Sequence, residues 1–292
     1  MKQKLFLKYA EFYITNVCNL KCTGCNRFNS FAFKGWNSWR DYELVYQQWS
    51  EQLNIGNISI MGGEPLLNPE FDLWVLGLRK LWPQAALAIA SNGTQLHKHK
   101  DFYQTLLQDP RLKINVSLHN KQHKAVMLQH VKDFLTPPFT YSFNNMPYNQ
   151  SLTITDSNNI SIKILYNWWF HQGAVIAGPE LGQHTLHQSN PEVAHSICHS
   201  KTCHHFENGR LYKCGPSALF PEFDRQIGLT LLQEDRELIN SVASLGLEHS
   251  EEQKQQFLAQ IDQPIPQCKF CPESYQGQQI FAQEKKSVLF RQ

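Results

Sequence analysis

The sequence predicts an α/β fold in which helices wrap a mostly parallel sheet, followed by a small cysteine-rich domain. Two observations predict it. In the first half of the chain, strand-like apolar runs alternate with stretches of helical periodicity, as in parallel strands joined by helices. Five of the eight cysteines lie at or beyond residue 198. We therefore expect one domain over residues 1–190 and a second over residues 191–292.

The first half divides into four strands with three helices between them. Residues 10–17 form the first expected strand, since they are mostly apolar, aromatic or β-branched. Asp41 is a suitable N-cap for a helix that reaches residue 53. Further buried strands and helices follow from short apolar runs and helical periodicity. The strands are expected at residues 58–61, 86–90 and 112–118, and the helices at residues 69–82 and 100–108.

Two hairpins are expected in the second half. Residues 152–155 and 160–165 flank a polar turn of four residues, Asp156 to Asn159. The segment from Phe206 to Cys214 contains Asn208-Gly209, a dipeptide that favours a two-residue hairpin turn. Cys214 is therefore expected at the end of a return strand.

Functional residues are expected at the carboxyl ends of the parallel strands, because short strand-to-helix loops build sites there. Glycine-rich or polar segments follow each strand of the first half. These segments are Cys18 to Cys25, Gly62-Gly63-Glu64-Pro65, Ser91-Asn92 and Ser117. We expect all of them on one rim of the sheet.

Composition and charge exclude several classes of function. The net charge is +2, so no nucleic-acid partner is predicted. The amino-terminal apolar run is too short for a signal peptide, and no later stretch approaches a membrane-spanning length. Eight cysteines without an export signal indicate a reducing compartment and metal ligation. A cytoplasmic protein without a membrane partner is expected.

The most informative motif is Cys18-x3-Cys22-x2-Cys25. A [4Fe–4S] cluster takes four thiolates, so a loop that supplies three leaves one iron open to a small molecule. A zinc site is the alternative, since Cys-x2-Cys is a common zinc half-site. The next strand runs into Gly62-Gly63-Glu64-Pro65. Glycines at that point allow close backbone approach, and this second element favours the iron–sulfur interpretation.

These two motifs resemble those of the radical SAM superfamily. The resemblance implies a partial (β/α)6 TIM-like barrel and a [4Fe–4S] cluster on the three cysteines, with S-adenosylmethionine (SAM) on the open iron. It also implies that Gly62, Gly63, Glu64 and Pro65 hold the methionyl amino group of SAM.

The resemblance further implies that the third and fourth strand ends contact the cofactor through Ser91, Asn92 and Ser117. The alternative is that Ser91-Asn92-Gly93 only turns the chain and that Ser117 is a satisfied core hydroxyl. Many members carry an aromatic residue where this chain has Gly24. Aromatic packing on the adenine is therefore expected from elsewhere, with Phe28 as the candidate.

The cysteines of the last third resemble those of the twitch domain, a shortened relative of the SPASM domain that binds one auxiliary [4Fe–4S] cluster. They are Cys198, Cys203, Cys214, Cys268 and Cys271. Four thiolates fill such a cluster, so either Cys198 or Cys203 is spare or all five serve in a way that the sequence does not reveal. The family spacing favours Cys198 as a ligand and leaves Cys203 as the spare thiol. A zinc ribbon is the alternative.

The resemblance implies an oxidoreductase-type reaction. SAM would be cleaved to a 5′-deoxyadenosyl radical that takes a hydrogen atom from a C–H bond of a peptide, protein or small-molecule substrate. A flavodoxin or ferredoxin would supply electrons. The auxiliary cluster favours net oxidation or crosslinking, whereas hydrogen return from Cys203 or Cys198 would give epimerisation. A sugar or aminoglycoside dehydrogenase or epimerase is one alternative. A non-catalytic zinc-binding interaction protein is the other.

Overall fold

The computed structural model describes residues 4–22, 25–29, 33–119, 123–146, 150–166, 175–177 and 184–274. Its strands are β1 (Leu5–Tyr13), β2 (Leu53–Met61), β3 (Ala86–Ser91), β4 (Leu112–Leu118), β5 (Thr140–Asn144), β6 (Ser151–Thr155), β7 (Ser161–Tyr166), β8 (Val175–Ala177), β9 (His184–Leu186), β10 (His204–Glu207), β11 (Arg210–Tyr212) and β12 (Ser244–Leu245). Its α-helices are α1 (Trp39–Gln52), α2 (Phe71–Leu81), α3 (Phe102–Gln108), α4 (Lys124–Phe134), α5 (Pro191–Ser196), α6 (Gly215–Ile227), α7 (Gln233–Asn240) and α8 (Glu251–Gln260).

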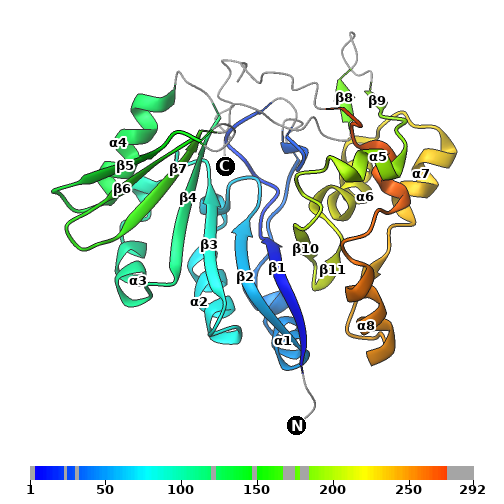
Figure 1. Cartoon of the computed structure of the whole chain (residues 1–292), viewed down its shortest axis with the longest axis horizontal. Coiled ribbons are helices and arrows are strands. Elements are labelled where there is room, and N and C mark those ends of the chain that lie inside the picture. The colour runs from blue at the N-terminus through cyan, green and yellow to red at the C-terminus, as the bar shows by residue number, and fades with distance from the viewer. Residues whose placement is uncertain are drawn as a thin grey trace.

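One ten-stranded sheet runs through the molecule, in the order β12-β11-β10-β1-β2-β3-β4-β7-β6-β5 (Figure 1). The six strands from β10 to β7 in that order pair in parallel, and the outer strands are antiparallel. The expected α/β fold with a large, mostly parallel sheet is confirmed. So is the hairpin of β6 and β7, whose strands pair from Ser151↔Leu165 to Thr155↔Ser161.

The two faces of the sheet differ in polarity. On β4, Ile114 and Val116 are buried in the main core, whereas Lys113 is exposed and Asn115 and Ser117 are half-buried. The buried face packs on the helices through large aromatic side chains of α1 and α2, such as Trp49 and Trp74. This alternation leaves a polar face opposite the helix layer.

Two predicted elements begin elsewhere. The first strand spans Leu5–Tyr13, not residues 10–17, because its pairing with β2 begins at Leu5↔Leu53 and ends at Tyr13↔Met61. The first helix begins at Trp39, with Ser38 as its N-cap in place of Asp41. The Ser38 hydroxyl and the Trp39 N–H both donate to Glu70 Oε2, at 2.9 and 2.8 Å. A carboxylate from a neighbouring element thus takes the place of a local cap, and Asp41 lies in the first turn.

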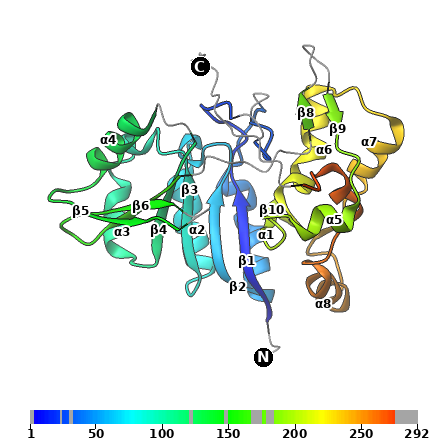
Figure 2. The same cartoon turned by 45° about the horizontal axis from the view of Figure 1, so that its top comes forward.

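The carboxyl-terminal region extends the central sheet. The predicted hairpin with Asn208-Gly209 is present as β10 and β11, and both turn residues have positive φ, 50° and 75°. Its first strand pairs in parallel with β1, at Ala10↔His204 to Phe12↔Phe206. Figure 2 shows β10 beside β1, with α6 next to it. Both cysteine regions therefore lie on a single sheet.

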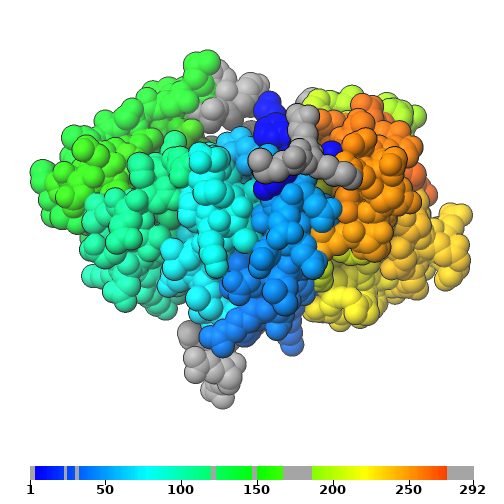
Figure 3. Space-filling view, turned by 90° about the horizontal axis from the view of Figure 1, so that it is seen from below, coloured from blue at the N-terminus to red at the C-terminus, as the bar shows by residue number. Residues whose placement is uncertain are grey.

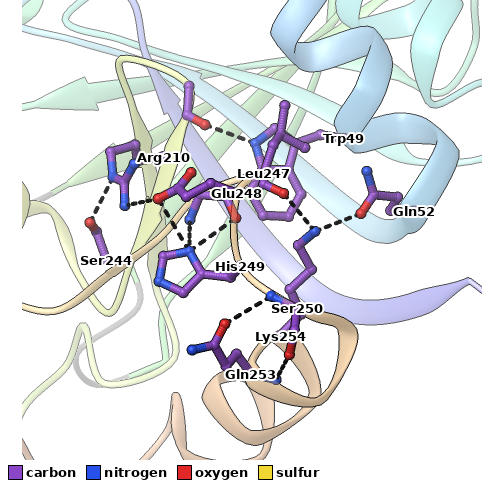
Figure 4. A network of polar contacts seen from close by, with 12 residues as sticks. Trp49, Gln52, Arg210, Ser244, Leu247, Glu248, His249, Ser250, Gln253 and Lys254 are labelled. Carbon is purple, nitrogen blue, oxygen red and sulfur yellow. Dashed lines mark hydrogen bonds and ion pairs between the residues drawn. The ribbon is translucent and has the colours of Figure 1, made fainter.

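A polar network fastens α8 to α1 and to the β10–β11 turn (Figure 4). The Lys254 ammonium donates to Gln52 Oε1 at 2.8 Å and to the Leu247 carbonyl at 3.0 Å. The Trp49 indole donates to the Gly209 carbonyl at 2.8 Å. Ser250 and Gln253 form a capping box at the start of α8. In the space-filling view the orange surface of α8 accordingly lies against the blue surface of α1 (Figure 3).

A second hydrophobic cluster joins the loop after β1 to the carboxyl-terminal region. It comprises Tyr13, Phe28, Phe33, Leu219, Phe220, Phe223, Leu229, Ile239 and Phe270.

Within the described part of the chain, no helix has both the length and the apolar character that crossing a membrane requires.

Candidate metal and cofactor site

The loop after β1 holds Cys18, Cys22 and Cys25, each buried or half-buried. The Leu20 N–H points at Cys18 Sγ at 3.4 Å. Burial raises the pKa of the Cys18 thiol, and the nearby Glu64, Cys25 and Cys22 raise it further. Burial also raises the pKa of Cys25. Burial therefore disfavours the thiolate forms of Cys18 and Cys25 in the metal-free chain, whereas a bound metal centre would favour them.

The paired glycines bring the turn after β2 into contact with this loop. The Gly63 N–H donates to the Thr15 carbonyl at 2.7 Å, and the Glu64 N–H donates to the Val17 carbonyl at 2.8 Å. A Cβ on Gly63 would lie 2.4 Å from the Val17 carbonyl oxygen, and one on Gly62 would lie 2.6 Å from that of Thr15. Only glycine fits at either position without displacing the cysteine loop.

The Glu64 carboxylate joins this turn to the end of β3. Its side chain is fully buried, and it accepts hydrogen bonds from the Ser91 hydroxyl at 2.7 Å, the Asn92 N–H at 2.6 Å and the Leu66 N–H at 3.2 Å. Burial raises the pKa of Glu64 to about 7, although the three donors oppose the shift. The expected contact between Glu64 and an amino group remains a prediction, since the carboxylate already serves these donors.

Asn92 extends the same contacts to the cysteine loop. Its Nδ2 donates to Asn19 Oδ1 at 2.9 Å and points at Cys18 Sγ at 3.9 Å. Asn19 Nδ2 in turn donates to the Thr94 hydroxyl at 2.7 Å. The sequence motifs on β1, β2 and β3 thus converge at one rim. Ser117 lies half-buried near the end of β4, the next strand in the sheet.

Phe28 does not have the role expected for it. Its ring is 1% exposed and stacks on Phe223 of α6, with centroids 4.5 Å apart and planes 7° apart. Phe220 packs on it at 5.2 Å. Because this ring lies in the second hydrophobic cluster, it cannot also cover an adenine. The expectation is wrong because burial against α6, far away in the sequence, competes for the same aromatic surface.

The carboxyl-terminal cysteines divide into a group of four and one neighbour. Burial is the largest cause that raises the pKa of Cys271, and the nearby thiols of Cys214, Cys198 and Cys268 raise it further. Burial likewise raises the pKa of Cys203, to about 12, and the Glu11 carboxylate is the second largest cause that raises it. Cys198, Cys214, Cys268 and Cys271 therefore form one group, which we call the four-cysteine group. Cys203 lies between that group and β1.

A buried charge network between the two cysteine regions was not foreseen from the sequence. Arg27, two residues after Cys25, forms an ion pair with Glu11 of β1, and His205 Nδ1 lies 3.2 Å from Glu11 Oε2. Burial disfavours a charged Glu11, but Arg27 and His205 lower its pKa overall. The one sequence signal is an acidic residue inside an apolar strand.

The residues present fit an iron–sulfur cluster at the amino-terminal loop. The loop supplies three cysteines within eight residues, and a backbone N–H of the kind that tunes cluster sulfurs points at Cys18. Among the described residues, no three His, Cys, Asp or Glu side chains converge as a single metal ion requires. A cluster binds each thiolate at a separate iron, whereas a zinc ion gathers its ligands around one point. The choice between the two stays a prediction.

Comparison with known families and curated proteins concerns the first half of the chain. Residues 12–130 match the sequence model of the radical SAM superfamily. The GTP 3′,8-cyclase of Nautilia profundicola is 28% identical over 132 residues, which cover 44% of this chain and 40% of the relative. That of Campylobacter jejuni (strain RM1221) is 27% identical over 131 residues, with the same coverage. The chain thus matches about 40% of the length of these relatives.

Three solved structures align with part of this chain. Streptococcus suis SuiB bound to its precursor peptide SuiA is 21% identical, with a TM-score of 0.35 over 41% of this chain and 26% of SuiB. BtrN in complex with AdoMet and 2-DOIA is 27% identical, with a TM-score of 0.33 over 40% of this chain and 48% of BtrN. Native anSMEcpe with AdoMet and a Cp18Cys peptide is 17% identical, with a TM-score of 0.34 over 45% of this chain and 40% of that protein. Each alignment covers less than half of this chain.

Proposed function

We propose that this protein, whose residues 12–130 match the sequence model of the radical SAM superfamily, cleaves SAM reductively and abstracts a hydrogen atom from a C–H bond of its substrate. The observation that carries the proposal is the convergence of three sequence motifs. Gly63 and Glu64 bond to the backbone of the cysteine loop, and Asn92 points at Cys18. A zinc site needs the cysteines alone, whereas a cofactor site needs the surrounding rim as well.

The chain's own residues hold and orient the cofactor. Cys18, Cys22 and Cys25 would hold a [4Fe–4S] cluster, which when bound supplies one electron to SAM and yields methionine and a 5′-deoxyadenosyl radical. The turn at Gly62 and Gly63 presents backbone groups beside the loop, because the glycines leave no side chain in the way. Glu64 fixes that turn to β3. Asn92 and Ser117 remain candidate cofactor contacts on the two following strand ends.

The substrate is proposed to face the polar side of the sheet. Opposite the helix layer, half-buried Asn115 pairs in register with half-buried Lys163 of β7, and Ser117 pairs with Leu165. A peptide or protein is the proposed substrate class, and a sugar or aminoglycoside is the alternative. An electron donor such as a flavodoxin or ferredoxin would reduce the cluster.

The four-cysteine group is proposed to hold an auxiliary [4Fe–4S] cluster, as in a twitch-like domain. Four thiols from three separate segments influence one another there, and four is the number that a fully ligated cluster takes. Net oxidation would then be possible, because a second cluster can accept the substrate's remaining electron. Cys203 remains a candidate hydrogen-atom donor. Burial raises its pKa to about 12, which keeps it a thiol at neutral pH.

The test compares the wild type with a variant in which Cys18, Cys22 and Cys25 are all replaced by alanine. Both proteins are reconstituted anaerobically, reduced with dithionite and assayed for 5′-deoxyadenosine. The wild type is expected to release it, and the variant is expected to fall to the level of dithionite and SAM alone. Equal yields from the two proteins would reject the proposal. Zinc without iron or sulfide in the purified protein would favour the interaction-protein alternative.

A further inference from the structure

Arg27 is a buried cation whose hydrogen bonds are only partly satisfied. The residue is 8% exposed. One guanidinium nitrogen, Nη2, pairs with Glu11 and contacts Met61 Sδ at 3.4 Å. The other two, Nε and Nη1, are buried and have no acceptor among the described residues. Leaving a buried donor unpaired destabilises the folded chain, and more so when the donor is charged, so these N–H groups require an acceptor.

The unpaired side of the guanidinium faces the start of α6. A Cβ on Gly215 would lie 2.2 Å from Arg27 Nη1 and 2.9 Å from Nε, so only a glycine at the first position of α6 lets the guanidinium approach. The residue before it, Cys214, is the N-cap of this 13-residue helix. A helix start carries partial positive charge and free N–H groups. Two positive groups therefore meet at a point where the metal-free chain offers only thiols.

The surrounding charges leave this point short of negative charge. Glu11 balances Arg27 on one side only. Lys213 adds a second cation, which donates to the Ile261 carbonyl at 2.7 Å and has Asp262 as its nearby carboxylate. His205 adds no negative charge. Cys214, Cys203 and Cys25 are the thiols near enough to interact electrostatically with Arg27, and of the three Cys214 directly precedes Gly215, against which the guanidinium lies. A group with several anionic sulfurs at Cys214 would satisfy both the helix start and the unpaired N–H groups.

We infer that Arg27 is the cationic hydrogen-bond donor to a sulfur of the auxiliary cluster at Cys214, where it raises the cluster's reduction potential. The inference rests on the auxiliary cluster of the proposed function. Reduction adds negative charge to the cluster, and a nearby guanidinium stabilises that charge more than the oxidised form. Because Arg27 follows Cys25 by two residues, the amino-terminal cysteine loop contributes a residue to the second site.

The test uses chains in which Cys18, Cys22 and Cys25 are replaced by alanine, so that only the auxiliary cluster is present. In this background Glu11→Gln and Arg27→Gln are combined, which avoids leaving a lone buried carboxylate. The matched control combines Asp224→Asn and Arg236→Gln, an ion pair of 2.9 Å at the other end of α6. Iron is counted for each protein, and the midpoint potential is measured by redox titration followed by electron paramagnetic resonance.

We expect equal iron in all three proteins and a lower potential only in the Glu11/Arg27 variant. At a fixed potential its reduced-to-oxidised ratio should fall about tenfold, which is 59 mV for a one-electron couple. Gly215→Ala, which would push the guanidinium away without removing its charge, should lower the potential less. If the Glu11/Arg27 double variant does not fold, the midpoint potential of the Gly215→Ala variant alone tests the inference. Retained iron with an unchanged potential in the folded variants would overturn the inference, and it would point to a substrate anion as the partner of Arg27. Absence of iron from the parent background would instead reject the auxiliary cluster itself, and the inference with it.

Discussion

The two cysteine regions differ in how the chain assembles them. The amino-terminal loop supplies three thiols within eight residues, and neighbouring strand ends hold that loop through backbone hydrogen bonds. The four-cysteine group draws its members from segments up to 73 residues apart, from Cys198 to Cys271. A local site keeps its spacing in the unfolded chain, whereas a dispersed site exists only after folding. The amino-terminal cysteine loop should therefore tolerate changes in the four-cysteine group better than the four-cysteine group tolerates changes in the loop.

The largest expected effect is on the iron content. Replacing Cys268 and Cys271 together with alanine should remove about four of about eight irons per chain, because each cluster holds four. Cleavage of SAM should persist in part, since the amino-terminal loop is untouched. Iron and 5′-deoxyadenosine are measured on the same anaerobic preparation. An unchanged iron count would show that the dispersed region holds no cluster.

The next effect concerns pH and the turn that supports the local site. Burial raises the pKa of Glu64 from 4.5 to about 7. The folded state therefore binds this proton more tightly, and stability present below pH 4.5 is lost as the pH rises through 7. The loss amounts to about 3 kcal/mol at 1.36 kcal/mol per pKa unit. Denaturant unfolding of metal-free wild type and Glu64→Gln from pH 4.5 to 8 measures it.

The Gln variant should lack this part of the pH dependence. Its stability relative to wild type should therefore rise across the same interval. The exposed Glu51 on α1 offers the control, because Glu51→Gln removes a carboxylate that is not buried. Parallel pH curves for wild type and Glu64→Gln would contradict the assignment.

A smaller effect is expected at the glycines that bring the two rim segments together. Gly63→Ala places a Cβ 2.4 Å from the Val17 carbonyl oxygen and should lower the free energy of unfolding by about 2 kcal/mol, as overpacking does. It should also impair SAM cleavage. Gly228→Ala is the control, since its Cβ would meet no atom within 4 Å despite a φ of 69°. If both variants cleave SAM equally, the close approach at Gly63 is not needed for the site.

The smallest effect is expected at the spare cysteine. Cys203→Ala should leave the iron content unchanged, because Glu11 acts on Cys203 more strongly than the thiols of Cys198 and Cys214 do, whereas after burial the groups that act on Cys271 are three thiols. Cys198→Ala is the matched comparison and should lose the auxiliary iron. Turnover in deuterated water, once a substrate is known, then tests hydrogen return from Cys203. Loss of half the iron in Cys203→Ala would make it a ligand.

Local patterns in the sequence predicted local structure well. The strand at Leu112–Leu118, the Asn208-Gly209 turn and the hairpin of β6 and β7 follow from alternation and turn chemistry within short windows. The gathering of the cysteine loop, Gly62-Gly63 and Ser91-Asn92 also followed, because parallel strands bring their carboxyl ends together.

The features that were missed depend on contacts between distant segments. Nothing in the neighbourhood of His204 indicates that β10 pairs with β1. The stacking of Phe28 on Phe223 and the pairing of Arg27 with Glu11 likewise join residues whose types alone do not identify a partner. Arg27 and Phe28 follow a recognisable motif, yet their burial is decided by α6 and β1.

The pairing of β1 with β10 has a consequence for synthesis of the protein. Ala10 leaves the ribosome 194 residues before its partner His204, a delay of roughly 10–40 s at about 5–20 residues per second. During that interval β2 can cover one side of β1, but the other side presents unpaired N–H and C=O groups, the kind of edge that recruits other chains. Nascent chains stalled before residue 200 should therefore bind chaperones through β1, and chains stalled after β10 should release them.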